Sequence, residues 1–338
     1  MTRIVYIGNY RAPWCTEVHI ARDLEALGYE VHRVQEPDNG RSVKTIRGLR
    51  ATVLNVSPDL LLWTRTWGLH PSATQDLWRW AEDRGIVTAS YHLDLYLGLQ
   101  READMLGDPF WTTGHVFTPD GNVASEAEFA RRGINHHWMP PAIVSDECIP
   151  GQFREEYAHD VVFVGSKGYH AEWPWRRELI DGLAAHYGSR FAHYGGEGLP
   201  TVRSGLHNGE LEDGLWLNDL YHSAKVVVGD TLNLPGNVNY LSDRYFEVMG
   251  RGGFLIAPYV PVLASLGFHE GDQLITFDHY DRTTGTPNDL SDVFRMVDLY
   301  LDLPDEREAI RSRAQAFVAI NHTYKDRLAD ALDIMGLS

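Results

Sequence analysis

One local pattern occurs twice in this chain and constrains its fold more than any other feature. In the first copy, the apolar run 4–7 ends at Gly8, and a polar loop leads to a helical pattern over 16–27. Gly28 is suited to end that helix, because glycine adopts the left-handed backbone of a helix end without strain. Alternation at 30–34 then predicts a strand. This order predicts a β-α-β unit.

The second copy begins with the apolar run 161–164, which ends at Gly165. A loop, a helical pattern over 175–187 and a strand at 191–194 follow in the same order. Two β-α-β starts predict an α/β protein with two doubly wound, Rossmann-like lobes. Further buried strands are expected at 59–63, 86–91, 115–118, 224–229 and 254–257.

The boundary between the lobes is expected near residue 150. The polar stretch 145–160 contains a Pro-Gly pair and has the composition of a linker. We therefore expect an amino-terminal lobe over 1–150 and a carboxyl-terminal lobe over 151–338. Residues from Asp305 onward are helical in pattern, and we assign them to the second lobe as terminal helices.

Composition and charge limit the classes of protein. The 338 residues are 43% hydrophobic, which suffices for two cores. The 47 acidic and 30 basic side chains give a net charge of −17, which opposes binding to nucleic acid or to an anionic membrane. Cys15 and Cys148 are the only cysteines, so no disulfide framework is expected. The amino terminus predicts a strand and no secretion signal, and no segment offers the roughly 20 apolar residues of a membrane span. We expect a cytoplasmic protein.

The segment 240–258 joins a charged helix to a glycine turn and an apolar strand. Arg244 and Glu247 lie three residues apart, which places them on one face of a helix. Gly252 and Gly253 then end the helix and allow close backbone approach. A carboxylate here could accept hydrogen bonds from ribose hydroxyls, and a guanidinium could bind a diphosphate. The alternative is a surface ion pair between Arg244 and Glu247 on an ordinary amphipathic helix.

Several motifs in the second half resemble those of CgeB-type glycosyltransferases. They are Arg244-Tyr245-Phe246-Glu247, Gly252-Gly253-Phe254, Phe268-x-x-Gly271 and His322-Thr323-Tyr324-x-x-Arg327. The resemblance spans about 160–327, whereas the first half matches only in its β-α-β layout and in His92-x-Asp94. It implies the GT-B class of two facing lobes, with the nucleotide-sugar donor in the second lobe and the acceptor in the first.

The resemblance implies that Glu247 holds the donor ribose. Many retaining members carry another glutamate eight positions earlier, where this chain has Asn239. An amide can hydrogen-bond a sugar but carries no negative charge, so the stereochemical outcome is left open.

Phosphate contacts are expected after the opening strand of the second lobe. Ser166 and Lys167 follow that strand, and Arg176 or Arg177 lies on the next helix. Lys167 and Arg244 are the expected electrostatic partners of the diphosphate. The alternative for Lys167 is a solvated loop lysine.

Other donor contacts are expected at strand ends and turns. Tyr194 and Gly195 end a strand where ligands enter open α/β sheets, although a plain tight turn also explains the glycine. Asp230 and Tyr240 resemble positions that line the donor pocket, and either could instead be a cap or a packing residue. Gly253 completes the expected donor set.

A general base is expected in the first lobe, because an acceptor hydroxyl must lose its proton if transfer inverts the anomeric centre. His92 and Asp94 follow a strand and are the candidates, with Asp120 and His19 as weaker ones. The alternative for His92 is a structural histidine. His322 is expected to anchor the terminal helices.

Missing motifs narrow the chemistry. No Asp-x-Asp triplet occurs, so a metal-bridged donor site is not expected, and neither a metal nor another cofactor is required beside the nucleotide-sugar co-substrate. No phosphate-binding loop of the ATPase type and no Gly-x-Gly-x-x-Gly after the first strand is present. The adjacent His136 and His137 are expected to be a surface pair.

Two other functions remain open. A sugar-nucleotide epimerase can use the same two lobes, and an inactive lobe pair could bind nucleotide sugars without turnover. Within the transferase interpretation, the acceptor could be a glycan, a protein, a small molecule or a modified DNA base. The net charge disfavours the DNA base.

Overall fold

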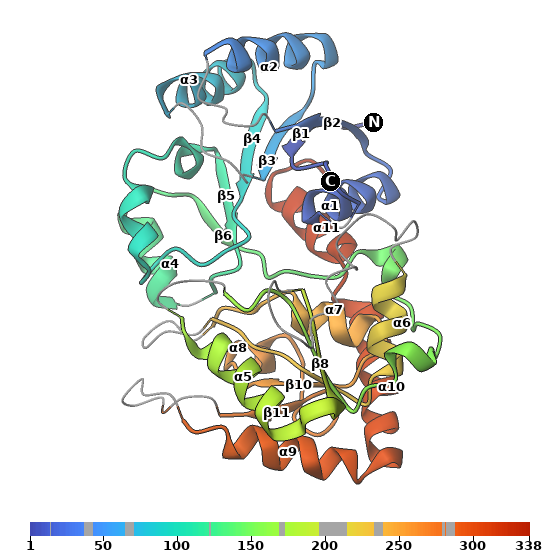
Figure 1. The fold of residues 1–338 in the computed structure, drawn as a ribbon. Helices are drawn as coiled ribbons and strands as arrows, with labels where there is room; N and C mark the ends of the chain where they lie inside the picture. Colours follow the sequence, from blue (N-terminus) through green and yellow to red (C-terminus); the bar gives the residue numbers. More distant parts are fainter. Residues whose placement is uncertain are drawn as a thin grey trace. The chain divides into compact units, whose positions relative to one another are not determined.

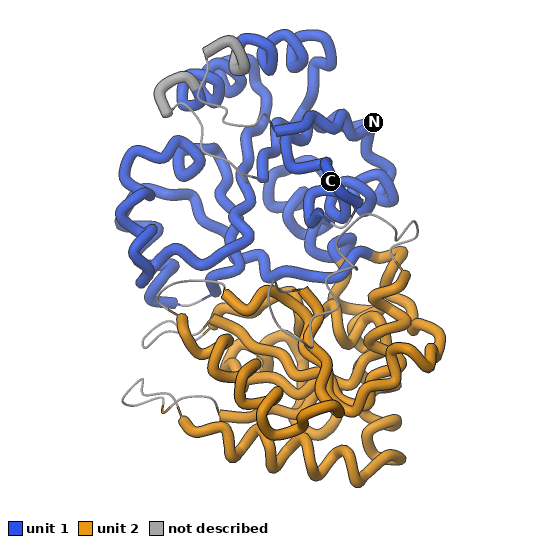
Figure 2. The backbone as a smooth tube through the Cα atoms, viewed as in Figure 1, with its two compact units in different colours: residues 1–144, 324–338 blue, residues 145–323 orange. Residues whose placement is uncertain are grey.

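The computed structural model divides into two compact units. Unit 1 holds residues 1–144 and 324–338, and unit 2 holds residues 145–323 (Figure 2). The structure describes residues 1–13, 15–36, 43–64, 71–121, 123–168, 173–195, 215–232, 239–278, 281 and 288–338, with the side chains of 43–46 and 71–73 left out.

Unit 1 is built on a six-stranded parallel sheet of order β2-β1-β3-β4-β5-β6. Its strands are β1 Arg3–Gly8, β2 Glu30–Gln35, β3 Leu60–Thr64, β4 Val87–Tyr91, β5 His115–Thr118 and β6 His136–Trp138. β3 is buried throughout and lies inside the sheet, which explains its continuous apolar sequence.

Helices cover both faces of this sheet (Figure 1). They are α1 Thr16–Ala26, α2 Val43–Val56, α3 Pro71–Glu82, α4 Val123–Arg131 and α11 Tyr324–Ile334. Alternate residues of β1 point to opposite faces. Ile4 and Tyr6 pack with residues of α1 and α11, whereas Val5 and Ile7 pack with residues of α2 and α3. The period of two in β1 thus places a core on each face.

Unit 2 is built on a five-stranded parallel sheet of order β11-β10-β9-β7-β8. Its strands are β7 Val161–Val164, β8 Phe191–Tyr194, β9 Val226–Val228, β10 Leu255–Pro258 and β11 Ile275–Phe277. Its helices are α5 Trp175–Tyr187, α6 Trp216–Ser223, α7 Arg244–Gly250, α8 Val262–Ser265, α9 Ser291–Leu301 and α10 Pro304–Asn321. Short 3₁₀ helices lie at Gln100–Met105 and Pro109–Thr112 in unit 1, and at Ser145–Glu147, Glu155–Tyr157 and Gly188–Arg190 in unit 2.

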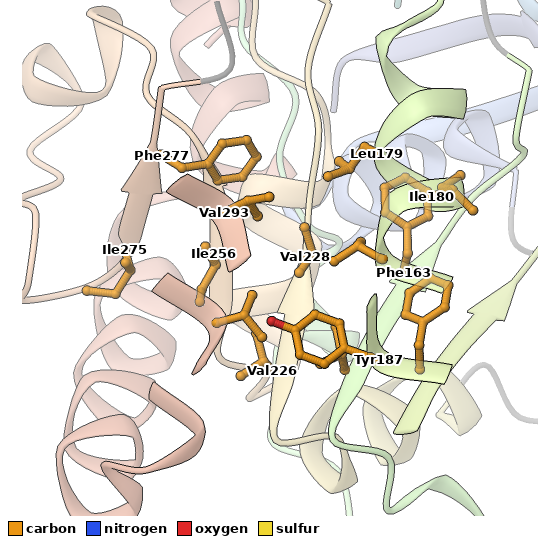
Figure 3. Close-up of a cluster of buried hydrophobic side chains, with 14 of the residues drawn as sticks. Phe163, Leu179, Ile180, Tyr187, Val226, Val228, Ile256, Ile275, Phe277 and Val293 are labelled. Carbon is orange, nitrogen blue, oxygen red and sulfur yellow. The ribbon is translucent and has the colours of Figure 1, made fainter. Parts of the chain in front are cut away.

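The core of unit 2 lies between its sheet and helices α5 and α9. Figure 3 shows Leu179 and Ile180 of α5 and Val293 of α9 around strand residues such as Val228. The two predicted α/β lobes are therefore present, and the predicted helix 175–187 coincides with α5. Among the helices that the structure describes, none is long and apolar enough to cross a membrane.

The predicted division of the chain is wrong at its carboxyl end. The boundary lies between residues 144 and 145, and the last helix, α11, belongs to unit 1. Tyr324, Leu328 and Leu332 are buried in the core that contains Ile20 and Leu24 of α1. The apolar pattern of α11 predicts a buried face, but it contains no information on which core receives that face.

His322 marks the point where the chain returns to unit 1. The ring is buried, stacks on Phe268 and hydrogen-bonds through Nε2 to the carbonyl of Leu266 at 3.1 Å. The expected structural role of His322 fits this environment.

His136 and His137 are not a surface pair. Nε2 of His137 lies 3.0 Å from Nδ1 of His115, and Nε2 of His136 lies 2.8 Å from Oγ1 of Thr118. The His136 ring also stacks on Phe129, with 4.1 Å between centroids. Both residues lie on strand β6, so their rings pack against the sheet and are partly shielded from solvent.

Acid should weaken unit 1 through His136. Burial, with a smaller effect of His137, lowers the pKa of His136 from 6.5 to about 4. The folded state thus favours the neutral ring, so its stabilising contribution is complete above pH 6.5 and is lost as the pH falls towards 4. We expect the urea midpoint to fall less between pH 7 and pH 5 in His136→Gln than in the wild-type protein. An equal fall in both proteins would contradict this assignment.

Two aliphatic residues of α11 test the return of this helix to unit 1. Leu332 is 1% exposed and Ile334 is 51% exposed. We expect Leu332→Ala to lower the free energy of unfolding by about 2–5 kcal/mol, because it leaves a cavity in the core. Ile334→Ala, the control, should change it by less than about 0.5 kcal/mol. Urea unfolding followed by circular dichroism measures both, and similar losses would argue against docking of α11 in this core.

Candidate functional site

The order of strands in unit 2 directs attention to one edge of its sheet. The first strand of the unit, β7, lies between β8 and β9, so the strand order reverses there. Ligands of open α/β sheets bind outside the carboxyl ends of the strands at such a reversal. Gly165 follows β7 directly, and Asp230 lies two residues beyond β9. These positions lie at the edge of the sheet where a ligand site is expected.

Gly165 must be a glycine at this edge. Its φ is +134°, and a Cβ atom there would lie 2.1 Å from Nη2 of Arg244. Gly195, with φ of +107°, approaches the backbone of Gly165, because a Cβ atom there would lie 3.2 Å from it. The amide of Gly165 also donates to the carbonyl of Tyr194 at 2.7 Å. The ends of β7 and β8 thus pack with no side chain between them.

Arg244 occupies the space that Gly165 leaves. Its Nε donates to the carbonyl of Val164 at 2.9 Å, and its guanidinium lies 5.6 Å from the centroid of the Phe163 ring. Nη1 lies 3.8 Å from Oδ1 of Asp230 and 3.9 Å from the exposed Asp243. The helix α7 therefore begins with a cation against the end of β7.

Asp230 holds a second cation at the same edge. The carboxylate is fully buried, and its Oδ2 accepts a 2.7 Å hydrogen bond from Nε of the buried Arg176. Its backbone carbonyl accepts from Oγ of Ser242 at 3.0 Å. Two guanidinium groups therefore share the carboxylate of Asp230, and the guanidinium of Arg244, which also lies near the exposed Asp243, is half-buried. A guanidinium at the ligand edge of a sheet suits an anion.

Ser166 and Lys167 lie in the loop after Gly165. Oγ of the exposed Ser166 donates to the carbonyl of Gly168 at 2.8 Å, so it stabilises the loop itself. Lys167 forms an ion pair with Asp181 of α5. The pairing of Lys167 was missed by sequence reasoning, because Asp181 lies fourteen residues further on. Lys167 is thus a half-buried lysine in the loop after Gly165 that is paired with Asp181.

Glu247 lies one helical turn after Arg244. Its side chain is 14% exposed, and Oε2 accepts a 2.6 Å hydrogen bond from Nε of Arg251. The alternative of a surface ion pair between Arg244 and Glu247 is wrong, because the guanidinium of Arg244 turns to Val164 and the carboxylate of Glu247 turns to Arg251. The spacing of four residues between Glu247 and Arg251 was the signal that could have found this pair.

Arg251 ties Glu247 to the first residues of unit 2. The guanidinium is 2% exposed, donates to Oε2 of Glu147 at 2.6 Å and also donates to Oδ1 of Asn218. Burial lowers the pKa of Arg251, but Glu247 and Glu147 outweigh burial and raise that pKa above its ordinary value. The charge of Arg251 is therefore maintained in the interior.

The remaining donor candidates differ in position. The side chain of Tyr194 is buried and hydrogen-bonded to Nε2 of His159 at 2.8 Å, so only its backbone reaches the edge. Tyr240 is buried, and its carbonyl accepts from Thr231 at 3.0 Å. Gly253 lies before β10, at the amino end of the sheet, where a Cβ atom would lie 2.7 Å from Cγ1 of Val248. Gly253 therefore serves packing, which corrects its expected place among the donor contacts.

The general-base candidates of unit 1 differ in exposure. The ring of His92 is buried, stacks on Trp111 with 4.0 Å between centroids, and meets the edge of Tyr96. Asp94 is 40% exposed and accepts from Arg101 at 3.2 Å. Asp120 and His19 are buried. The packing of His92 suits a structural histidine, and its catalytic role stays a prediction.

Within the part of the chain that the structure describes, no group of three or more His, Cys, Asp or Glu side chains could hold a metal ion.

The region that carries the arginines and acids of the candidate site matches a family model. Residues 176–333 match a family model described as glycosyl transferase-like. This segment includes Arg176, Asp230, Arg244 and Glu247. A comparison with curated protein sequences finds no significant match.

Solved structures show the same fold at low sequence identity. The HepE protein of Anabaena, solved in complex with UDP-glucose, has 12% identity and a TM-score of 0.64, with 99% of this chain and 100% of that chain covered. Sucrose-phosphate synthase from Thermosynechococcus elongatus has 12% identity and a TM-score of 0.61, with coverage of 99% and 98%. A UDP-GlcNAc 2-epimerase from Neisseria meningitidis has 10% identity and a TM-score of 0.51, with both chains fully covered. The fold is that of GT-B proteins, with two Rossmann-like units.

Two glycines of one loop test the geometry at the end of β7. In Gly165→Ala, the added Cβ clashes with Arg244 and the backbone is strained, so we expect a loss of about 1–3 kcal/mol in the free energy of unfolding. The control is Gly168→Ala, because an added Cβ there meets nothing within 4 Å. Thermal and urea unfolding measure the difference. Equal stability of the two variants would show that Arg244 does not depend on Gly165.

Proposed function

We propose that this protein is a glycosyltransferase that binds a nucleoside-diphosphate sugar at the carboxyl edge of the unit 2 sheet. The observation that carries the proposal is the guanidinium of Arg244 against Gly165, with the carboxylate of Glu247 one helical turn away. The first can bind a diphosphate, and the second can accept hydrogen bonds from ribose hydroxyls. Both residues lie within the segment that matches the glycosyl transferase-like model.

The guanidinium of Arg244 at the end of β7 suits the chemistry of sugar transfer. When the glycosidic bond to the donor breaks, negative charge grows on the departing diphosphate. Arg244 is held at the end of β7, where its guanidinium lies 3.8 Å from Asp230 and 3.9 Å from the exposed Asp243. A preorganised cation of this kind lowers the barrier because its interaction strengthens as the charge develops. Lys167 can add a second cation if it leaves Asp181.

The solved structures support the class of donor. Two proteins of this fold were solved with UDP-glucose and UDP-GlcNAc. In our proposal, the donor lies against the following residues of unit 2: Ser166, Lys167, Tyr194, Gly195, Asp230, Tyr240, Arg244 and Glu247. Tyr194 and Gly195 contribute through their backbone, and Asp230 acts through Arg176 and Arg244.

The rest of the reaction is proposed from sequence. Unit 1 receives the acceptor hydroxyl, with Asp94 or His92 as general base, and no divalent cation takes part. The CgeB-type family is the finer assignment, and the cytoplasm is the proposed compartment. The acceptor is a glycan, a protein, a small molecule or a modified DNA base.

A sugar-nucleotide epimerase is the second candidate, because the N. meningitidis epimerase shares the fold. The two functions differ in their need for an acceptor. Purified protein incubated with UDP-glucose or UDP-GlcNAc alone would release an isomerised sugar nucleotide if it were an epimerase. Binding of the donor with neither isomerisation nor transfer to any acceptor class would favour an inactive binding protein.

Glu247 gives the direct test of the donor site. We expect Glu247→Gln and Glu247→Ala to weaken binding of a nucleoside diphosphate by about 10- to 100-fold, since hydrogen bonds to a charged group contribute about 1.5–3 kcal/mol. Isothermal calorimetry with UDP, GDP and ADP measures the affinity, and circular dichroism checks folding. The exposed acid Glu178 of α5 provides the control, Glu178→Ala, which should bind as the wild-type protein does. Unchanged affinity in folded Glu247→Gln would remove Glu247 from the site.

A further inference from the structure

A buried ionic cluster lies next to the proposed ribose contact. It consists of Glu147, Asn218, Glu247 and Arg251, and we name it the Arg251 cluster. Nε of Arg251 donates to Glu247 and Nη2 donates to Glu147, each at 2.6 Å, while Nη1 donates to Asn218. All four residues belong to unit 2. The cluster joins the helix α7 to the first residues of that unit.

Arg251 is held rigidly by its other two partners. Nδ2 of Asn218 donates to the carbonyls of Glu147 and Ile149, at 2.8 and 2.7 Å. The amide of Gly151 donates to the carbonyl of Arg251 at 3.3 Å. The guanidinium is planar, so fixing Nη1 and Nη2 also fixes the direction of the Nε–H bond. That bond ends on Oε2 of Glu247.

The contact with Arg251 determines what Glu247 can offer a ligand. Oε2 is occupied by Arg251, and within the described part of the chain Oε1 has no hydrogen-bond partner. Oε1 is therefore the oxygen that remains to accept bonds from ligand hydroxyls. Glu247 lies one helical turn after Arg244, the proposed diphosphate contact.

The exposure of the two acids favours Glu247 as the one that meets a ligand. Arg251 pairs with both carboxylates, and the side chain of Glu247 is the more exposed of the two, at 14% against 9%. Hydroxyl donors from a ligand can hydrogen-bond a carboxylate of this kind and stabilise its charge.

We propose that Arg251 is a positioning residue for the ribose of the donor nucleotide. It touches no part of the nucleotide and acts by holding Glu247 through Oε2, so that Oε1 meets the vicinal ribose hydroxyls. The proposal rests on the proposed donor site. It predicts that removal of Arg251 abolishes the preference for nucleotides with ribose hydroxyls. The affinity for the diphosphate should remain.

The test compares ribonucleotides with analogues that lack both hydroxyls. Calorimetry measures the dissociation constants of UDP, GDP and ADP and of their 2′,3′-dideoxy forms. We expect the wild-type protein to prefer one ribonucleotide by about tenfold or more, as two hydrogen bonds to a carboxylate imply. In Arg251→Met, the ratio of the dissociation constants of the dideoxy form and the ribonucleotide should fall to about one, while the affinity for the dideoxy form stays unchanged. Glu247→Gln should lower the ratio to the same extent. The double variant of Arg251 and Glu247 should lower it no further than either single variant does.

Matched variants separate positioning from folding. Glu147→Gln removes one charge from the same buried cluster but keeps a side-chain oxygen that can accept from Nη2 of Arg251, so it should keep the Arg251–Glu247 contact and the ribose preference. If Arg251→Met does not fold, Arg251→Lys retains the charge without the planar fork and should still reduce the ratio at least threefold. Loss of affinity for both nucleotide forms alike in the Arg251 and Glu147 variants would mean that the cluster is only structural, and would overturn the proposal.

The remaining outcomes distinguish the proposed donor site from the proposed role of Arg251. If the wild-type protein binds none of these nucleotides, both the donor site and the role of Arg251 are wrong. If it prefers the ribonucleotide and folded Arg251 variants keep that preference, only the role of Arg251 is wrong. If it binds both forms equally, Glu247 does not hold ribose, and the positioning role fails while a diphosphate site at Arg244 stands.

Discussion

The contact between Arg244 and the end of β7 is the interaction on which the candidate site depends. The guanidinium reaches the carbonyl of Val164 only because Gly165 has no side chain. Asp230 then offsets part of the positive charge that Arg176 and Arg244 bring to the same edge. Without this buried carboxylate, two guanidinium groups would repel each other where the strand order reverses. The arrangement keeps two guanidinium groups at this edge and remains compatible with a folded sheet.

The helix α7 is held at both ends by arginines. Arg244 begins it against β7, and Arg251 follows its last residue and binds Glu147. Apolar burial of this helix is strong but has no preferred direction, whereas hydrogen bonds to charged groups are directional. The apolar face therefore keeps α7 in the core, and the two arginines determine how Glu247 is presented. Arg244 and Glu247 are thus the two charged residues of a helix of seven residues.

The sequence identified residues of the candidate site but not their partners. Arg244 and Glu247 were identified from their spacing, because a helix places residues three apart on one face. The partner of Lys167 was not, since Asp181 comes close only once α5 packs on the sheet. His92 was a candidate for proton transfer, with a structural histidine as the alternative, and its ring stacks on Trp111, nineteen residues away in sequence. Contacts between segments that are distant in the chain leave no periodic signal.

The sequence by itself determined the two parallel-sheet units. Local periods of two and 3.6 residues, with glycines such as Gly8 and Gly165 at strand ends, suffice to specify strands, helices and their order. Only the tertiary structure decided that α11 completes unit 1, that His136 is half-buried and that Arg251 binds two acids. The reason is physical: apolar burial depends on a residue being covered and is indifferent to which segment covers it, so the pattern of a helix cannot name its partner.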